Sequence, residues 1–376
     1  MTVGWMICCA AAIGVNGYIG WHYWHDACRK HKYAGAALTA VHLLLAACAA
    51  VYLFLYFTAV PRSVFTTVFS YIAAVYLGLL IYMALFYLMC DLMRFLLRKR
   101  LNRKAKGMLR RIYCGGLAVF LLAAAVTLGG IYGARQLRVS HYTITLPRLH
   151  TEVQTLRAAL VSDLHLGLVR SLKDLEEIKQ QIEKQKPEAV FLCGDIFDES
   201  TSPQDAEEAA RMIGGIETRY GVFYIPGNHE YTSGRAARQM QALSDAGVTV
   251  LCDRTIRVAD AFFLAGRIDG KGPRAPLDEV LGETPAGDLP VILLDHRPLY
   301  GESARDERVS LQLSGHTHNG QIFPYTPLEL LGRLSYGLFR QEGRLQVAVT
   351  SGVGMFGVPL RIGSFNEIVE LVIRFQ

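Results

Sequence analysis

The chain has 376 residues, of which 51% are hydrophobic and only 19% are charged. This composition excludes a disordered chain and argues against an ordinary soluble protein. The net charge of +6 hides a contrast, because residues 1–134 hold 13 basic and two acidic residues, whereas residues 135–376 hold 26 and 31. No nucleic-acid binding is expected from the second part, which lacks the positive charge that binding to phosphates requires.

Residues 1–134 are predicted to form an all-α transmembrane domain. A helix that crosses a bilayer needs ~20 largely apolar residues, and this region contains four uncharged segments of that kind. The four expected helices cover about residues 2–24, 34–60, 63–90 and 112–134. The first is the weakest because it contains Asn16 and His22, and a cleaved signal peptide is its alternative. Buried core helices are the alternative for the other three.

The positions of Lys and Arg predict the orientation in the membrane, since short cytoplasmic loops are rich in both. Twelve lie in the first and third loops, namely Arg29, Lys30, Lys32, Arg94, Arg98, Lys99, Arg100, Arg103, Lys104, Lys106, Arg110 and Arg111. Three lie on the opposite side, namely Arg62, Arg135 and Arg138. We therefore expect a multi-pass integral protein of the inner or plasma membrane, with residues 135–376 on the extracytoplasmic side.

Only two of the eight cysteines, Cys193 and Cys252, lie outside this membrane domain. Each ends an apolar run typical of a strand, so two buried thiols are the favoured expectation and a disulfide is the alternative. The chain contains no C-x-x-C spacing, and the sequence therefore does not support a zinc–thiolate site.

Residues 135–376 alternate between short apolar runs and charged segments with helical spacing. The predicted strands are residues 158–161, 189–193, 222–225, 248–252, 262–265, 291–294 and 309–313, and the predicted helices are residues 171–185, 203–217 and 234–246. Together with a strand-rich region after residue 345, this pattern is typical of layered α/β structure around a largely buried sheet. In open α/β sheets, functional side chains gather where the strands end.

Acidic, amide and imidazole side chains follow five of these apolar runs. They are Asp163 and His165, Asp195 and Asp198, Asn228 and His229, Asp295 and His296, and His316 and His318. Carboxylate, imidazole and amide groups without thiolate suit Mn, Fe, Co or Zn better than Ca or Mg. Two ions about 3.5–4 Å apart need one shared ligand, which a carboxylate can supply.

The spacing within the loops favours the same chemistry. In Asp163-x-His165 and in His316-x-His318, the two named residues are two positions apart, so on an extended backbone they point the same way and can reach one ion. Gly167 and Gly315 stand beside these pairs and allow tight turns and close backbone approach. His229, next to a candidate ligand, is expected to point the opposite way and to donate a proton to a leaving oxygen.

The ordered motifs D-x-H, G-D-x-x-D, G-N-H-E, a lone His before Pro and G-H-T-H-N-G-Q resemble the calcineurin-like metallophosphoesterase superfamily, most of all its bacterial membrane-associated branch with N-terminal transmembrane helices. The resemblance covers roughly residues 142–375, including the closing segments 351–354 and 357–361. It implies an α/β fold, an αββα two-sheet sandwich, for residues 135–376. Two departures stand out: Asn319 occupies a position where glycine is common, and Asp295 one where small residues are frequent.

The resemblance also implies the cofactors and the role of each residue. The cofactors would be two divalent metal ions, with Mn favoured over Fe, Zn and Co. One ion would be held by Asp163, His165, Asp195 and His318, and the second by Asp195 as the bridge with Asn228, His296 and His316. His229 would be the general acid or a phosphate contact.

Three further charged residues near these motifs have two interpretations each. Asp198 either hydrogen-bonds a ligand histidine or caps a helix. Glu230 is expected to support the ligands or the fold, with catalysis as the alternative. Arg297 either contacts the substrate phosphate or, as favoured, pairs with a nearby acid.

The apolar residues 322–339 follow His318 directly, and they either pack on the domain or form a lip in the membrane interface.

We therefore expect a membrane-anchored dinuclear phosphoesterase in which a metal-bridging hydroxide attacks a phosphodiester or phosphomonoester, in particular one of a lipid or a lipid-linked envelope compound. One alternative is a broad-specificity phosphodiesterase for soluble nucleotides that is only tethered to the membrane. Another is a non-enzymatic binding or scaffold protein with a vestigial site, against which the complete ligand set argues.

Overall fold

The computed structural model describes residues 2–26, 32–58, 60–100, 102, 104, 116–298, 301–303, 305–326, 335–340 and 345–376. Most of the predicted third basic loop and residues 327–334 of the predicted apolar segment lie outside these described residues. The chain divides into two compact units. The helical unit comprises Met1–Tyr56, Ser63–Tyr132 and Gly357–Leu360, and the sandwich unit comprises Phe57–Arg62, Gly133–Phe356 and Arg361–Gln376.

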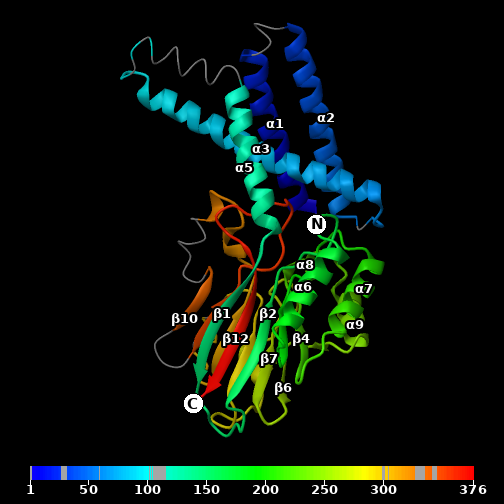
Figure 1. Ribbon diagram of the computed structural model, residues 1–376, viewed down its shortest axis with the longest axis vertical. Coiled ribbons are helices and arrows are strands. Elements are labelled where there is room, and N and C mark those ends of the chain that lie inside the picture. The colour runs from blue at the N-terminus through cyan, green and yellow to red at the C-terminus, as the bar shows by residue number, and fades with distance from the viewer. Residues whose placement is uncertain are drawn as a thin grey trace. The chain divides into compact units, whose positions relative to one another are not determined.

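The helical unit is built from the apolar segments of the first third. Its helices are α1 (Thr2–Asp26), α2 (Lys32–Tyr56), α3 (Val64–Leu97) and α5 (Leu117–Arg135, whose last residues belong to the sandwich unit) (Figure 1). Three described segments are long and apolar enough to cross a membrane: residues 39–56, α3 and α5. The predicted first span does form a helix, α1, and the total of four spans stays a prediction.

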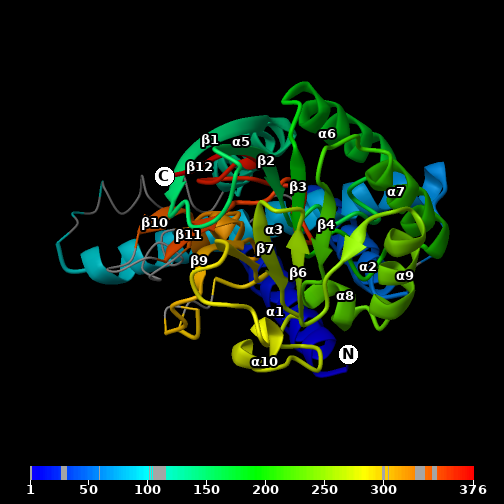
Figure 2. The ribbon, with the colours of Figure 1, turned by 90° about the horizontal axis from the view of Figure 1, so that it is seen from below.

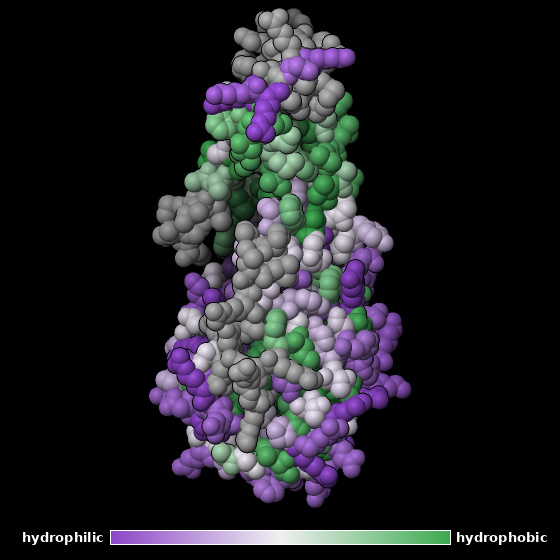
Figure 3. All heavy atoms as spheres, turned by 90° about the vertical axis from the view of Figure 1, so that its left-hand side faces the viewer, coloured by the Kyte–Doolittle hydropathy of each residue, from purple (hydrophilic) through white to green (hydrophobic). Residues whose placement is uncertain are grey.

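Helix α3 is longer than the sequence indicated. A capping box between Ser63 and Thr66 fixes its start, because each side chain accepts the other residue's backbone N–H. The helix then continues past the predicted end at Cys90, through Asp91 and Arg94. Figure 3 shows that the surface of this unit is largely apolar, whereas that of the sandwich unit is largely hydrophilic.

Polar side chains within the helical unit pair with one another. The Tyr76 hydroxyl donates to Asn16 Oδ1 at 3.0 Å and lies 3.1 Å from His42 Nδ1, which joins α1, α2 and α3. Near one end of α3, the Tyr18 hydroxyl donates to the Asp91 carboxylate at 2.7 Å. Such pairs satisfy polar groups where lipid offers no partner, and they hold neighbouring helices together.

The sandwich unit consists of two six-stranded sheets, which confirms the predicted α/β sandwich. The first sheet has the order β1-β12-β2-β3-β4-β5 and the second has the order β10-β11-β9-β8-β7-β6. The first contains β1 (Leu137–Leu146), β12 (Asn366–Phe375), β2 (Thr155–Val161), β3 (Ala189–Cys193), β4 (Gly221–Ile225) and β5 (Thr249–Val250). The second contains β10 (Gly337–Arg340), β11 (Gln346–Val349), β9 (Val309–Ser314), β8 (Val291–Leu294), β7 (Phe262–Gly266) and β6 (Arg254–Val258).

Helices cover the outer faces of the two sheets. In Figure 2, α6 (Leu172–Lys184), α7 (Pro203–Gly214) and α9 (Ala236–Asp245) lie on the side of β3 and β4, and the short α10 (Leu277–Leu281) lies beside β6 and β7. The buried face of α6 carries Leu175, Ile178 and Ile182, three or four residues apart as one face of a helix requires. The layer outside the second sheet, with α10 alone among these helices, is much thinner than the layer outside the first sheet, with α6, α7 and α9.

Apolar residues of both sheets form the core between them. This core includes Leu160 and Phe191 of the first sheet and Leu264, Leu294 and Leu313 of the second, all of which are fully buried. Strands β3 and β8 are buried along their whole length, which explains why their sequences are continuous apolar runs without alternation. Strand β9 is also buried throughout, although its residues alternate between apolar and polar.

The predicted strands and helices of residues 155–314 are confirmed, with one strand shortened to β5. The strands that the sequence analysis missed are β1, β6 and β10, whose residues mix polar and apolar side chains and are only partly buried where described. Cys193 and Cys252 are both free thiols, as favoured. The first is buried and the second is half-buried, with its Sγ 3.3 Å from Met240 Sδ.

Candidate metal centre

The seven predicted ligand residues lie in loops at the carboxyl ends of five strands. Asp163 and His165 follow β2, Asp195 follows β3, Asn228 begins helix α8 (Asn228–Thr232) after β4, His296 follows β8, and His316 and His318 follow β9. In each sheet these strands are parallel neighbours, so their carboxyl ends open on the same edge. The two-sheet architecture therefore gathers residues from widely separated parts of the chain.

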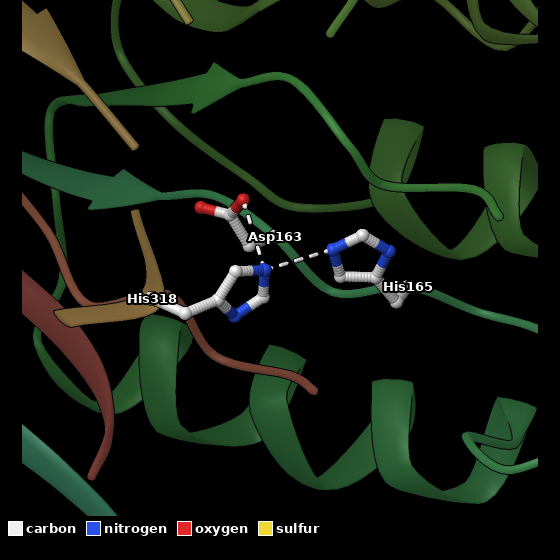
Figure 4. A group of neighbouring side chains, drawn as sticks. All are labelled: Asp163, His165 and His318. Atoms are coloured by element: carbon white, nitrogen blue, oxygen red, sulfur yellow. Dashed lines mark hydrogen bonds and ion pairs between the residues drawn. The ribbon is translucent and has the colours of Figure 1, made fainter. Parts of the chain in front are cut away.

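The first group of candidate ligands consists of Asp163, His165 and His318 (Figure 4). Their ligand atoms all lie within 4.8 Å of one another. His165 Nε2 is 3.1 Å from His318 Nε2, and His318 Nε2 is 3.5 Å from Asp163 Oδ1. These separations are short enough for the three side chains to hold a single ion.

The second group consists of Asp195, His296 and His316, and Asp195 connects it with the first. Its Oδ2 atom is 3.0 Å from His296 Nε2 and 4.0 Å from His165 Nε2. One carboxylate oxygen therefore lies between imidazoles of both groups, which is the position that a bridging ligand needs.

Asn228 supplies a further observation that fits a metal ion. Its side chain is buried, and its Oδ1 atom has no hydrogen-bond partner among the residues that the structure describes. A buried amide oxygen without a partner costs free energy, which coordination of a cation would recover. Nitrogen and oxygen donors without thiolate suit divalent transition metals, so the residues present fit such ions.

The ligand loops do not have the extended backbone that the sequence analysis assumed. The φ angles of Asp163, His165, Asp195, His316 and His318 are 57°, 50°, 53°, 72° and 51°. The premise that residues two apart point the same way from a strand is therefore wrong here, although the side chains do converge. Positive φ is costly for residues with a Cβ, and such strain is concentrated at functional sites.

Asn319 also has a positive φ, of 48°. Glycine and asparagine are the residues that adopt this conformation most readily, which explains why asparagine can stand where the resemblance leads us to expect glycine.

Burial keeps three of the histidines neutral. It lowers the pKa of His165 and of His318 well below the usual range, and it lowers the pKa of His316 to about 4. A neutral imidazole retains the lone pair that coordination of a metal requires.

The Asp195 charge raises the pKa of two other histidines, His296 and His229. Burial alone would raise the pKa of Asp195, but the charges of His296 and His229 hold it well below its usual range. Burial would lower the pKa of both histidines, yet the Asp195 charge raises that of His296 to about 10 and, with Glu199, that of His229 to about 9. Burial raises the pKa of Asp163 to about 6. Asp195 thus stays ionised in the interior.

His229 does not point away from the cluster, because Asn228 and His229 begin a helix and the alternation of a strand does not apply. The His229 Nδ1 atom lies 2.9 Å from a carboxylate oxygen of buried Glu199, and its Nε2 atom lies 4.0 Å from Asp195 Oδ2. The ring centroid is 4.7 Å from that of His165. Glu199 therefore orients the imidazole so that its Nε2 atom faces the two groups of candidate ligands.

Glu230 supports the ligand loops, as expected. Its buried carboxylate accepts the backbone N–H groups of Asp195, Ile196, Phe197 and Gly227 at 2.8–3.1 Å. Burial and the Asp195 charge raise its pKa to about 7. One side chain thus fixes both the backbone of the proposed bridging residue and the turn before Asn228.

Asp198 takes neither of its two expected roles. Its carboxylate accepts the backbone N–H and the hydroxyl of Ser200 at 2.7 and 2.6 Å, and helix α7 is capped by Ser202 instead. Burial, followed by the Glu199 charge, raises the pKa of Asp198 to about 7. A Cβ atom at Gly167 would collide with Asp198 and Ser200, which explains the glycine there.

Arg297 and Asp295 belong to ion pairs behind the centre. Arg297 Nε donates to Asp269 at 2.6 Å, which is the favoured alternative for this arginine. Asp295 accepts two bonds from the guanidinium of Arg274, at 2.9 and 2.6 Å. The acid before His296 is thus part of a bidentate pair that fixes the loop after β8.

Sequence reasoning missed three residues near the centre: Glu199, Arg361 and Phe356. Glu199 follows Asp198 directly, and an adjacent pair of acids was the available signal. The Phe356 ring is 45% exposed and its centroid lies 4.7 Å from that of His229. Arg361 donates to the backbone carbonyl of His318 at 2.6 Å.

Comparisons with known proteins identify the family of this chain. The family model "Calcineurin-like phosphoesterase" matches residues 156–320. An uncharacterized metallophosphoesterase of Aquifex aeolicus is 32% identical over 248 residues, which are 63% of this chain and 92% of that protein. The chain belongs to the calcineurin-like metallophosphoesterase family.

Relatives of this metallophosphoesterase include membrane proteins. The "Transmembrane protein with metallophosphoesterase domain" of Danio rerio is 32% identical over 275 residues, 69% of this chain, and this chain spans only 62% of that protein's length. The metallophosphoesterase YkuE of Bacillus subtilis is 28% identical over 296 residues, which are 72% of this chain and 99% of that protein. Together with the three apolar helices, the relative from Danio rerio indicates a membrane protein.

Glu230→Gln is expected to destabilise the metallophosphoesterase by about 1–3 kcal/mol, because the amide turns an NH2 group towards backbone N–H groups that need an acceptor. Metal affinity should fall with it, since Asp195 loses its support. Thermal unfolding and metal titration of the purified protein measure both effects. Glu188→Gln is the matched control, because that carboxylate is half-buried and accepts the backbone N–H of Arg157 at 3.0 Å. Equal behaviour of the two variants would contradict the role of Glu230.

Proposed function

We propose that this protein hydrolyses a phosphomonoester or phosphodiester at a dinuclear metal centre. One ion is held by Asp163, His165, Asp195 and His318, and the other by Asp195, Asn228, His296 and His316. The observation that carries this assignment is the position of Asp195 Oδ2, 3.0 Å from His296 Nε2 and 4.0 Å from His165 Nε2. When bound, the two ions supply an activated water and neutralise charge that develops on the phosphate. Manganese suits the nitrogen and oxygen donors and is the first metal to test.

His229 acts as the proton donor to the leaving oxygen. Glu199 accepts from Nδ1 at 2.9 Å, which fixes the ring and leaves the Nε2–H group directed at the centre. The His229 backbone N–H donates to Asp195 Oδ1 at 2.8 Å, so the donor and the shared carboxylate keep a constant separation. The side chain is 14% exposed, which allows a substrate oxygen to approach it.

The substrate is an amphiphile, in the first place a phospholipid or a lipid-linked phosphoester. Exposed aromatic rings in the sandwich unit support this: Phe356 beside His229, and Phe323 and Tyr325, which are 49% and 53% exposed. The Gln321 side chain ties the two loops together, since it both donates to and accepts from the backbone of Phe356 at 3.0 and 2.8 Å. Aromatic rings are favoured at the boundary between headgroups and hydrocarbon.

The centre faces the extracytoplasmic side of the membrane. The distribution of Lys and Arg supports this orientation, because twelve of them lie in, or at the helix ends beside, the two connections that would be cytoplasmic and three lie on the other side.

Asp195→Asn is expected to weaken the binding of both ions, because the shared ligand loses its charge, whereas His165→Ala should weaken mainly one. Metal content after dialysis and calorimetric titration with Mn²⁺ distinguish the two patterns. An Asp195→Asn protein that keeps two tightly bound equivalents would refute the bridging role.

His229→Ala is expected to keep both ions and to lower kcat by ~10²–10⁴-fold, the range that general-acid catalysis contributes. The loss should be small for a p-nitrophenyl ester, whose leaving group needs little protonation, and large for the alkoxide of a phospholipid headgroup. Steady-state turnover of both esters by the wild type and the variant measures the difference. Equal losses would point to phosphate binding in place of proton donation.

The same assay tests the substrate class when soluble nucleotide esters are added to the panel. We expect the wild type to prefer the detergent-dispersed lipid. A preference for the nucleotides would favour the tethered nucleotide phosphodiesterase instead.

The orientation predicts that a membrane-impermeant thiol reagent labels Gln204→Cys in intact cells, with any outer barrier permeabilised, because Gln204 is exposed on α7. Lys99→Cys, exposed after α3, should be labelled only after lysis. The wild type supplies the background from its own cysteines. The reverse labelling pattern would place the centre in the cytoplasm.

A further inference from the structure

Arg361 is a buried arginine that connects two loops of the metal centre. Its Nη1 atom donates to the backbone carbonyl of His318 at 2.6 Å. Its Nη2 atom donates to the carbonyls of Ser351 and Gly354 at 2.7 and 2.6 Å. A single guanidinium thus spans the loop that carries His318 and the loop of residues 351–354.

The second of these loops packs on the loop that carries Asp163. The backbone N–H of Val353 donates to Ser162 O at 2.9 Å. A Cβ atom at Gly352 would collide with Asp163, so the two backbones approach as closely as glycine permits. Through residues 351–354, Arg361 therefore fixes the distance between the two halves of the first ligand group, Asp163 on one loop and His318 on the other.

Arg361 is itself held by Asn366. The Asn366 Oδ1 atom accepts from Arg361 Nε at 2.9 Å, and its Nδ2 atom donates to the backbone carbonyl of Ala134 at 2.5 Å. Ala134 lies in the last turn of α5. Carbonyls in the last turn of a helix have no partner within the helix, and Asn366 satisfies one of them.

We propose that Arg361 is a positioning residue for the first metal ion, because it holds His318 at a fixed distance from Asp163. Asn366 in turn holds Arg361 in place through its hydrogen bonds to Arg361 and to Ala134. This inference rests on the ligand set of the proposed function. The guanidinium suits the task because it offers five donors in a rigid plane, whereas a lysine offers three donors on one atom and cannot reach all these carbonyls at once.

The test is a calorimetric titration of the full-length, detergent-solubilised, metal-free protein with Mn²⁺. His318→Ala identifies the binding event of the first ion, because it removes the ligand itself. Arg361→Lys is expected to weaken that same event by ~10–100-fold, the usual effect of losing a group that orients a ligand, and to leave the second event unchanged. Excess Mn²⁺ should restore occupancy and kcat of Arg361→Lys, and it should do so less well for His318→Ala.

Arg170→Lys is the matched control, since this buried arginine donates to the neighbouring carbonyl of Val353 at 2.8 Å. Unchanged binding by Arg361→Lys, or the same loss in the Arg170 control, overturns the inference. His318→Ala with both events intact would instead refute the ligand set. If Arg361→Lys does not fold, Asn366→Ser decides: a weaker first event is expected, and an unchanged one contradicts the inference.

Discussion

Four backbone N–H groups converge on the buried carboxylate of Glu230, and the geometry of the metal centre depends on this arrangement. Three of them belong to consecutive residues that begin at Asp195, whose φ angle of 53° would be unfavourable without such support. The fourth belongs to Gly227, immediately before Asn228. Glu230 thereby supports two predicted ligands through their backbone, and the amide dipoles offset part of the cost of burying its charge.

The strained backbone of this site is held in place by hydrogen bonds from the surrounding residues. Five of the seven predicted ligands have positive φ angles, and each such residue costs of order 1–3 kcal/mol unless its surroundings impose the conformation. The surroundings do so through contacts with backbone groups: Glu230 holds amides, Arg361 holds carbonyls, and the Asp163 carboxylate accepts the N–H of His316 at 3.0 Å. These contacts hold the predicted ligands through the protein's own backbone groups, an arrangement that would favour tight binding of an ion that matches their geometry.

The sequence predicted the parts of this site that depend on strand ends, and it missed those that depend on how a loop turns. Asp163, Asp195 and His296 were found because buried parallel strands are continuous apolar runs, and their carboxyl ends share one edge of the sheet. Which of two adjacent acids reaches His229 could not be predicted, because Asp198 is diverted by a turn with Ser200, and Glu199 takes its place. The bond from Arg361 to His318 joins residues 43 apart in the chain, and no local pattern announces such a pairing.

The pairing of β1 with β12 has a consequence for biosynthesis. These ten-residue strands lie side by side in parallel, Leu137 opposite Asn366 and Leu146 opposite Phe375, and β1 begins two residues after α5 ends. The ribosome therefore delivers β1 long before its neighbour exists, and closing a loop of this length opposes early pairing by its entropy. Until β12 emerges, the polar backbone groups on the edge of β1 remain open to other strands. Completion of the first sheet is thus a late step, and a newly made chain is most exposed to aggregation, or to capture by a chaperone, just before it.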